Sequence, residues 1–149
     1  MVDELTADEI RTLLRLEPHA TCGSVRITYL SAQSIAADGL PPPFSDARPM
    51  GSALYFMVTP TAPVRLHRIR NDQLYHYYLG DPLEVLLLRS DGTTDRVVVG
   101  PNLCGGEHLQ LFIPGVVPWR QHRVAGRGAR RRGDRQCRGT GGEVSVDCH

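Results

Sequence analysis

The stretch at residues 64–88, "VRLHRIRNDQLYHYYLGDPLEVLLL", decides the fold class. Short runs rich in branched and aromatic side chains alternate there with turn-forming segments at 70–72 and 80–82. This pattern predicts three strands, at 65–69, 73–79 and 83–88, separated by turns. The question that the stretch raises is whether His67, Gln73 and His76 form a site or only pack within a sheet.

Similar strand-like runs lie on both sides of this stretch. They cover residues 24–29, 53–58, 94–99 and 109–113. Turn signals that recur at intervals of about 8–12 residues predict an antiparallel sandwich or barrel. Upstream, Thr6 and Glu9 form a capping box, which predicts a short amphipathic helix at 7–15. Residues 31–51 contain three consecutive prolines and little periodicity, so they are predicted to form a long loop.

The composition bounds the class of protein. The chain has 149 residues with 41% hydrophobic and 22% charged side chains, which suits one globular domain. None of the four cysteines forms a CxxC pair, so a zinc knuckle is unsupported and the thiols are predicted to be buried or incidental. The N-terminus lacks a signal-peptide pattern, and no apolar run reaches about 18 residues. We therefore expect a soluble, cytoplasmic protein without a membrane partner.

The C-terminal segment differs from the rest of the chain. Residues 120–149 carry 8 arginines and 3 acidic side chains, whereas residues 1–119 carry 9 arginines and 13 acidic side chains. An arginine- and glycine-rich segment without apolar periodicity predicts disorder, or translation in the wrong reading frame. No aromatic side chains interleave with these arginines, so no specific nucleic-acid partner is expected. The predicted organisation is a domain at 1–119, with its core at about 15–115, and a tail at 120–149.

Four stretches carry a family resemblance. They are "LRLEPHATCGSVRITY" (14–29), "SALYFMVTP" (52–60), "LHRIRNDQLYHYYLGDPLEVLLL" (66–88) and "RVVVGPNLCGGEHLQLFIP" (96–114). In order and spacing they resemble the cupin superfamily, specifically a small bacterial and fungal group catalogued as a domain of unknown function. The resemblance implies an all-β, RmlC-like jelly roll (a double-stranded β-helix), here with a short N-terminal helix. It also implies a ligand pocket inside the barrel and often a homodimer. The last strands, expected after Pro114, are not recognisable, so they are predicted to be missing or replaced by the tail.

The resemblance also bears on metal binding. Metal-binding cupins present His-x-His, then a glutamate, with a further histidine on a later strand. Here His67 matches the first histidine, Ile69 stands in the second position, and Gln73 stands in the glutamate position. His122 is the candidate for the later histidine. Because a metal needs three or four ligands, no metal or other cofactor is predicted; any divalent ion would fall to His67 and Gln73.

Two histidines are candidates for proton transfer, because imidazole titrates near neutral pH. They are His67 and His76, and each has the alternative of being a hydrogen-bonded sheet residue. Strand alternation links Gln73 to its neighbours: if Gln73 faces the barrel interior, Tyr75 and Tyr77 do so as well, and His76 faces outward. The ligand-pocket candidates are Arg26, Tyr55, His67, Gln73, Tyr75, Tyr77 and Glu84.

The sequence thus leaves two functions open. One is an epimerase- or isomerase-like enzyme that acts on a small polar metabolite, with His67 as acid or base and Arg26 holding an anion. The other is a non-catalytic small-molecule-binding cupin, or a degenerate member of the family. Gln73 in place of an acid favours the second. Whether the chain is an enzyme remains open at this point.

Overall fold

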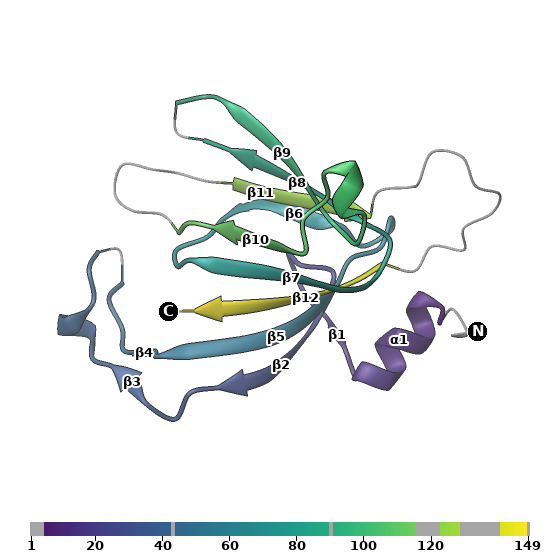
Figure 1. Cartoon of the computed structure of the whole chain (residues 1–149). Coiled ribbons are helices and arrows are strands. Elements are labelled where there is room, and N and C mark those ends of the chain that lie inside the picture. Colours follow the sequence, from purple (N-terminus) through teal and green to yellow (C-terminus); the bar gives the residue numbers. More distant parts are fainter. Residues whose placement is uncertain (1–4, 43, 90, 116–122, 129–140, 149) are drawn as a thin grey trace.

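Two antiparallel sheets form most of the molecule. The computed structural model describes residues 5–42, 44–89, 91–115, 123–128 and 141–148, the last two ranges through their backbone. The two sheets pack face to face as a jelly-roll barrel, and a single short α-helix lies beside them in the described part of the chain (Figure 1). The all-β fold predicted from the sequence is confirmed.

The larger sheet has six strands and the smaller one has four. In spatial order the larger sheet contains β1 (Glu17–Pro18), β2 (Ser24–Leu30), β5 (Gly51–Met57), β12 (Gly141–Cys148), β7 (Gln73–Gly80) and β10 (Gln110–Ile113). The smaller sheet contains β6 (Val64–Arg68), β11 (Arg123–Gly128), β8 (Leu83–Leu88) and β9 (Thr94–Val99). The strands predicted upstream of residue 115 are all present, with ends that differ by one or two residues.

The N-terminal helix begins at the predicted cap. In α1 (Ala7–Leu14) the Glu9 amide donates to Thr6 Oγ1 at 3.3 Å, and the Thr6 amide donates to Glu9 Oε2 at 2.7 Å. Ile10 on this helix packs with Met57 against the outer face of β5. Within the described residues, no helix is long and apolar enough to cross a membrane.

The segment at 31–51 is more ordered than the sequence predicted. It contains a small two-stranded sheet of β3 (Ser34–Ile35) and β4 (Arg48–Pro49), with the 3-10 helix η1 (Ala37–Gly39) between them. The prediction of a simple loop was therefore wrong in this detail. Runs of two paired residues carry no periodicity that a sequence pattern can detect.

The core fills the space between the two sheets. It is built from residues that are 6% exposed or less, among them Phe56, Tyr75, Val85 and Ile113. Strand β8 shows how the sequence places them: Leu83, Val85 and Leu87 are buried while the residues between them are partly exposed. This period of two is the signature of a strand with one face in the core.

The tail contributes a strand to each sheet. β11 lies between β6 and β8, and β12 lies between β5 and β7 (Figure 1). The predicted absence of recognisable final strands therefore does not hold for these two segments; the rest of 120–149 lies outside the described residues. The hydrogen bonds between paired strands join backbone groups. An arginine- and glycine-rich sequence can therefore form a strand even where its side chains do not show an alternating apolar pattern.

Candidate functional site

Strand β7 distributes the predicted site residues over two faces. Tyr75 is buried in the core and Tyr77 packs against it, while Gln73 pairs with the fully buried Ile113 of β10. These side chains face the barrel interior. His76 and Tyr78 alternate with them and lie on the outer face, where the Tyr78 ring meets Tyr55 at 6.4 Å between centroids. The structure therefore separates His76 from Gln73, as strand alternation requires.

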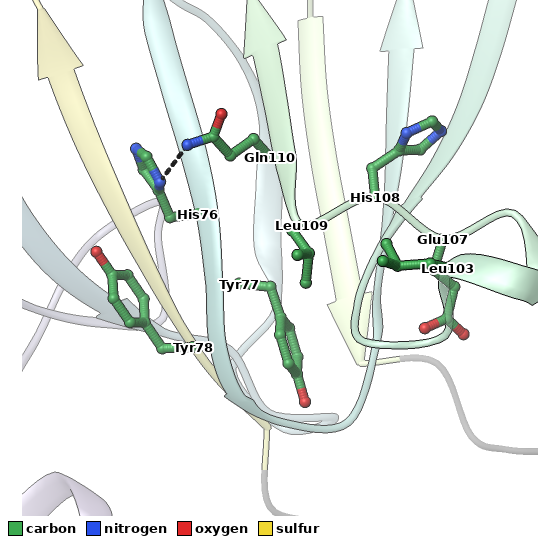
Figure 2. A pocket seen from close by; sticks show the side chains of 8 residues that line it. All are labelled: His76, Tyr77, Tyr78, Leu103, Glu107, His108, Leu109 and Gln110. Atoms are coloured by element: carbon green, nitrogen blue, oxygen red, sulfur yellow. Dashed lines mark hydrogen bonds between the residues drawn. The ribbon is translucent and has the colours of Figure 1, made fainter.

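A groove opens beside His76, where β7 and β10 lie next to the connection between β9 and β10. Its volume is about 530 Å³, and Figure 2 shows the side chains around it. They come from β7, from the start of β10, and from the connection between β9 and β10, which includes the 3-10 helix η2 (Leu103–Gly105). The lining residues are His76, Tyr77, Tyr78, Leu103, Glu107, His108, Leu109 and Gln110.

A side-chain hydrogen bond joins His76 of β7 to its paired neighbour Gln110 of β10. Gln110 Nε2 lies 3.0 Å from His76 Nδ1 (Figure 2). Since an amide nitrogen only donates, Nδ1 is the acceptor and the neutral ring carries its proton on Nε2. The Tyr78 ring lies 6.2 Å from the His76 ring between centroids, which gathers an imidazole, an amide and a phenol on one surface.

Backbone hydrogen bonds fix the opposite wall of the groove. The His108 amide donates to the Val98 carbonyl at 2.9 Å, and the Gly100 amide donates to the His108 carbonyl at 2.9 Å. The Tyr77 amide donates to the Leu109 carbonyl at 2.8 Å, which attaches this wall to β7. Sequence reasoning missed His108 and Gln110, although both stand in a stretch that carried the family resemblance.

His67 lies in a different environment. It is half-buried on β6, and Nδ1 lies 2.6 Å from the Arg65 carbonyl oxygen. The Cys22 side chain, as a hydrogen-bonding neighbour, is the largest cause that raises the pKa of His67 above its ordinary value, while burial opposes the shift. Cys22 was predicted to be buried or incidental; it is half-buried and packs against the core.

Gln73 carries an unmet hydrogen-bonding group. Its Oε1 atom is buried and accepts no hydrogen bond from the described residues. Buried polar atoms in proteins are normally paired, so an unpaired one marks a place where a bound molecule or water can contribute. Gln73 and His67 belong to different sheets, and no group of three metal-ligating side chains occurs within the described residues. His122 lies outside them. The described side chains therefore do not supply the metal-ligand set of the metal-binding cupins.

Three other pocket candidates lie away from both places. Arg26 is exposed on β2, and its guanidinium donates to the Leu14 carbonyl at 3.1 Å, at the end of α1. Tyr55 packs beside the helix on the outer face of the larger sheet. Glu84 lies on β8 within 3.5 Å of Arg96. These residues do not converge with Gln73 and Tyr75.

The comparisons with known proteins agree with this architecture. A hypothetical protein from Leishmania major matches with a TM-score of 0.79 and 24% identity, over 97% of this chain and 81% of that one. A protein from Shewanella oneidensis matches with a TM-score of 0.73 and 20% identity, over 97% of this chain and 78% of that one. No curated protein matches. The family model described as "Cupin superfamily (DUF985)" matches residues 8–130, beyond the span that the sequence motifs suggested. The chain belongs to the cupin superfamily, in the group described as DUF985.

Proposed function

We propose that this chain binds a small polar metabolite in the groove beside His76. The observation that carries the proposal is the convergence of His76, Gln110 and Tyr78 on an open volume of about 530 Å³. Ligand sites typically measure about 300–1,000 Å³ and combine apolar walls with a few oriented polar groups. The groove has both, because Leu103 and Leu109 lie beside these polar side chains.

The lining groups suit a ligand that carries several hydroxyl groups. His76 offers an Nε2–H donor, and the Gln110 amide retains its carbonyl oxygen as an acceptor. The Tyr78 hydroxyl can donate or accept, and the leucines provide a surface for carbon-bound hydrogens. A sugar derivative presents this alternation of hydroxyls and apolar faces, so sugars and nucleotide sugars are the first ligands to test.

An epimerase- or isomerase-like reaction is the catalytic form of this proposal. It requires a group that takes a proton from the bound ligand and a donor that stabilises the resulting anion; His76, which donates from Nε2, fills the second part, with Tyr78 beside it. Binding without catalysis is the alternative. Incorporation of solvent deuterium into a bound ligand distinguishes the two, because proton exchange at carbon requires the catalytic form.

The experiment that tests the proposal screens ligands by thermal shift and then measures dissociation constants for the wild type and three variants. His76→Ala and Gln110→Ala remove the groove's polar groups, while His67→Ala changes a half-buried side chain of β6 that does not line the groove. We expect each groove variant to weaken binding about 10-fold, the effect of losing one or two hydrogen bonds. His67→Ala should bind normally. Loss of binding in His67→Ala alone would place the ligand beside β6 and contradict the groove assignment.

A further inference from the structure

The outer face of the β7–β10 pair extends beyond the groove (Figure 1). Tyr75 of β7 and Ile113 of β10 are buried in the core, so the residues that alternate with them point away from it. The outward-facing residues are Leu74, His76, Tyr78, Gln110 and Phe112. Phe112 pairs with Leu74, two positions past the pair of Gln110 and His76, and it does not line the groove.

Two exposed aromatic rings stand at opposite ends of this face. The Tyr78 residue is 54% exposed and Phe112 is 56% exposed. Because Phe112 is opposite Leu74, four residues before Tyr78, the two aromatic residues are separated by roughly 13 Å along the strand direction. The hydrogen-bonded side chains of His76 and Gln110 lie between them. This separation is longer than a single sugar ring and suits a short linear chain of such rings.

The chemistry of this face favours an uncharged ligand. None of its five outward-facing residues is an acid, a lysine or an arginine. Glu107, which lines the groove and accepts a hydrogen bond from the Asn102 amide at 2.7 Å, would repel an anion. The face of an aromatic ring is negative, so it attracts the partly positive carbon-bound hydrogens of a sugar ring. The His76 and Gln110 side chains match the hydroxyl groups of the same molecule.

We propose that the ligand is a neutral linear oligosaccharide, with one sugar ring against Tyr78 and another against Phe112. The inference rests on the proposed function, because the groove beside His76 is the first of these two positions. Phe112 provides the second. A single sugar would fill the groove and leave Phe112 uncovered, and the diphosphate of a nucleotide sugar would meet no cationic side chain on this face. A large exposed apolar side chain next to a ligand groove is typical of an extended binding surface.

The dependence of affinity on chain length tests the inference. Titration calorimetry measures binding of the full-length protein to glucose, mannose and xylose, and to their linear β-1,4-linked oligomers of two to six units, with the α-1,4-linked glucose series alongside. In one of these series we expect affinity to rise about 10-fold or more from the single sugar to the trimer, because two linked contacts act together. Affinity should then level off once both rings are covered. Equal affinities for the single sugar and the trimer would overturn the inference, as would binding of no oligomer.

Variants at Phe112 test its role directly. Phe112→Ala should lower the affinity for the trimer about 10-fold and leave that for the single sugar unchanged. Phe112→Trp keeps an aromatic ring and should restore trimer binding. Leu66→Ala is the matched control, because Leu66 is an exposed apolar residue of β6 in the other sheet, and it should bind as the wild type does. Unchanged trimer binding in Phe112→Ala would overturn the inference.

Two results separate the failure of this inference from that of the proposed function. A metabolite whose binding requires His76 but not Phe112, together with no binding of any oligomer, would overturn the inference and leave the groove assignment intact. Ligand binding that requires neither residue would overturn both. Light scattering covers the other occupant of this face: if Phe112→Ala converts a dimer into a monomer, the face is an interface between two copies of the chain and the inference is wrong.

Discussion

His76 and Gln110 are hydrogen-bonded across the β7–β10 pair, with 3.0 Å between His76 Nδ1 and Gln110 Nε2. Strand β10 is the edge strand of the larger sheet, so this side-chain contact joins the edge strand to its neighbour β7. The contact also sets which ring nitrogen of His76 carries the proton. The groove therefore receives an Nε2–H donor whose orientation depends on a neighbouring strand.

Removal of that amide should alter the tautomer of His76. In the wild type, long-range proton–nitrogen NMR of the neutral ring should show the Nε2–H tautomer in excess. Gln110→Leu keeps a side chain of similar size but cannot donate, so the two tautomers should become more equally populated. Gln110→Asn is the control, because it keeps the amide group on a shorter side chain and so tests whether the amide must reach His76 Nδ1. An unchanged tautomer ratio in Gln110→Leu would mean that the hydrogen bond does not form in solution.

Gly23 should tolerate no side chain. Its φ is +58°, and a Cβ atom there would collide with the Met57 carbonyl oxygen and lie 3.0 Å from that of Ala62. Gly23→Ala therefore combines backbone strain with a clash against main-chain atoms that cannot rotate away. We expect it to lower the free energy of unfolding by about 3 kcal/mol or more, measured by urea denaturation.

Gly92 is the matched control for this prediction. Its φ is +84°, and a Cβ atom there would meet nothing within 4 Å. Gly92→Ala should therefore cost only the strain of a left-handed backbone, about 1 kcal/mol. Equal losses for the two variants would show that the close approach to Met57 contributes nothing.

The sequence predicted local structure better than it predicted long-range neighbours. The capping box of Thr6 and the alternation of β8 depend on residues a few positions apart, so a pattern reveals them. The bridge between Cys22 and Val64 depends on the pairing of distant segments, which no local period encodes. The groove wall at His108 likewise depends on backbone bonds to β9.

The C-terminal strands illustrate a second limit. Strand prediction uses side-chain periodicity, and residues 123–142 have none, although Val144 and Val146 alternate with polar residues within β12. In the structure β11 and β12 take their places through backbone pairing with neighbours on both sides. The alternative that this segment is translated out of frame stays a prediction, which resequencing of the gene addresses.

Strand β12 should be essential for the larger sheet. Residues 143–147 of this strand pair with β5 on one side and with β7 on the other, so backbone N–H groups there face a neighbouring strand on either side. Val146→Pro should remove a ladder hydrogen bond, leave a carbonyl unpaired and lower the free energy of unfolding by about 1–3 kcal/mol. Arg96→Pro on β9 is the comparison, because β9 is an edge strand that pairs only with β8 in its sheet. If denaturation midpoints show a smaller loss for Val146→Pro than for Arg96→Pro, β12 does not hold the central position in solution.

His67 should make stability depend on pH in a defined direction. Its pKa in the folded chain is raised, chiefly by the hydrogen bond to Cys22, so the folded protein binds this proton more readily than the unfolded chain. The resulting stabilisation is fully present below the unfolded pKa of about 6.5 and is lost as pH rises through the folded pKa. Urea denaturation of the wild type and His67→Gln at pH 5.5 and pH 8.5 isolates this contribution from other titrating groups. The difference in stability between the two proteins should be larger at pH 5.5; a difference that grows toward pH 8.5 would mean that the neutral ring, rather than the imidazolium, is the form that Cys22 stabilises.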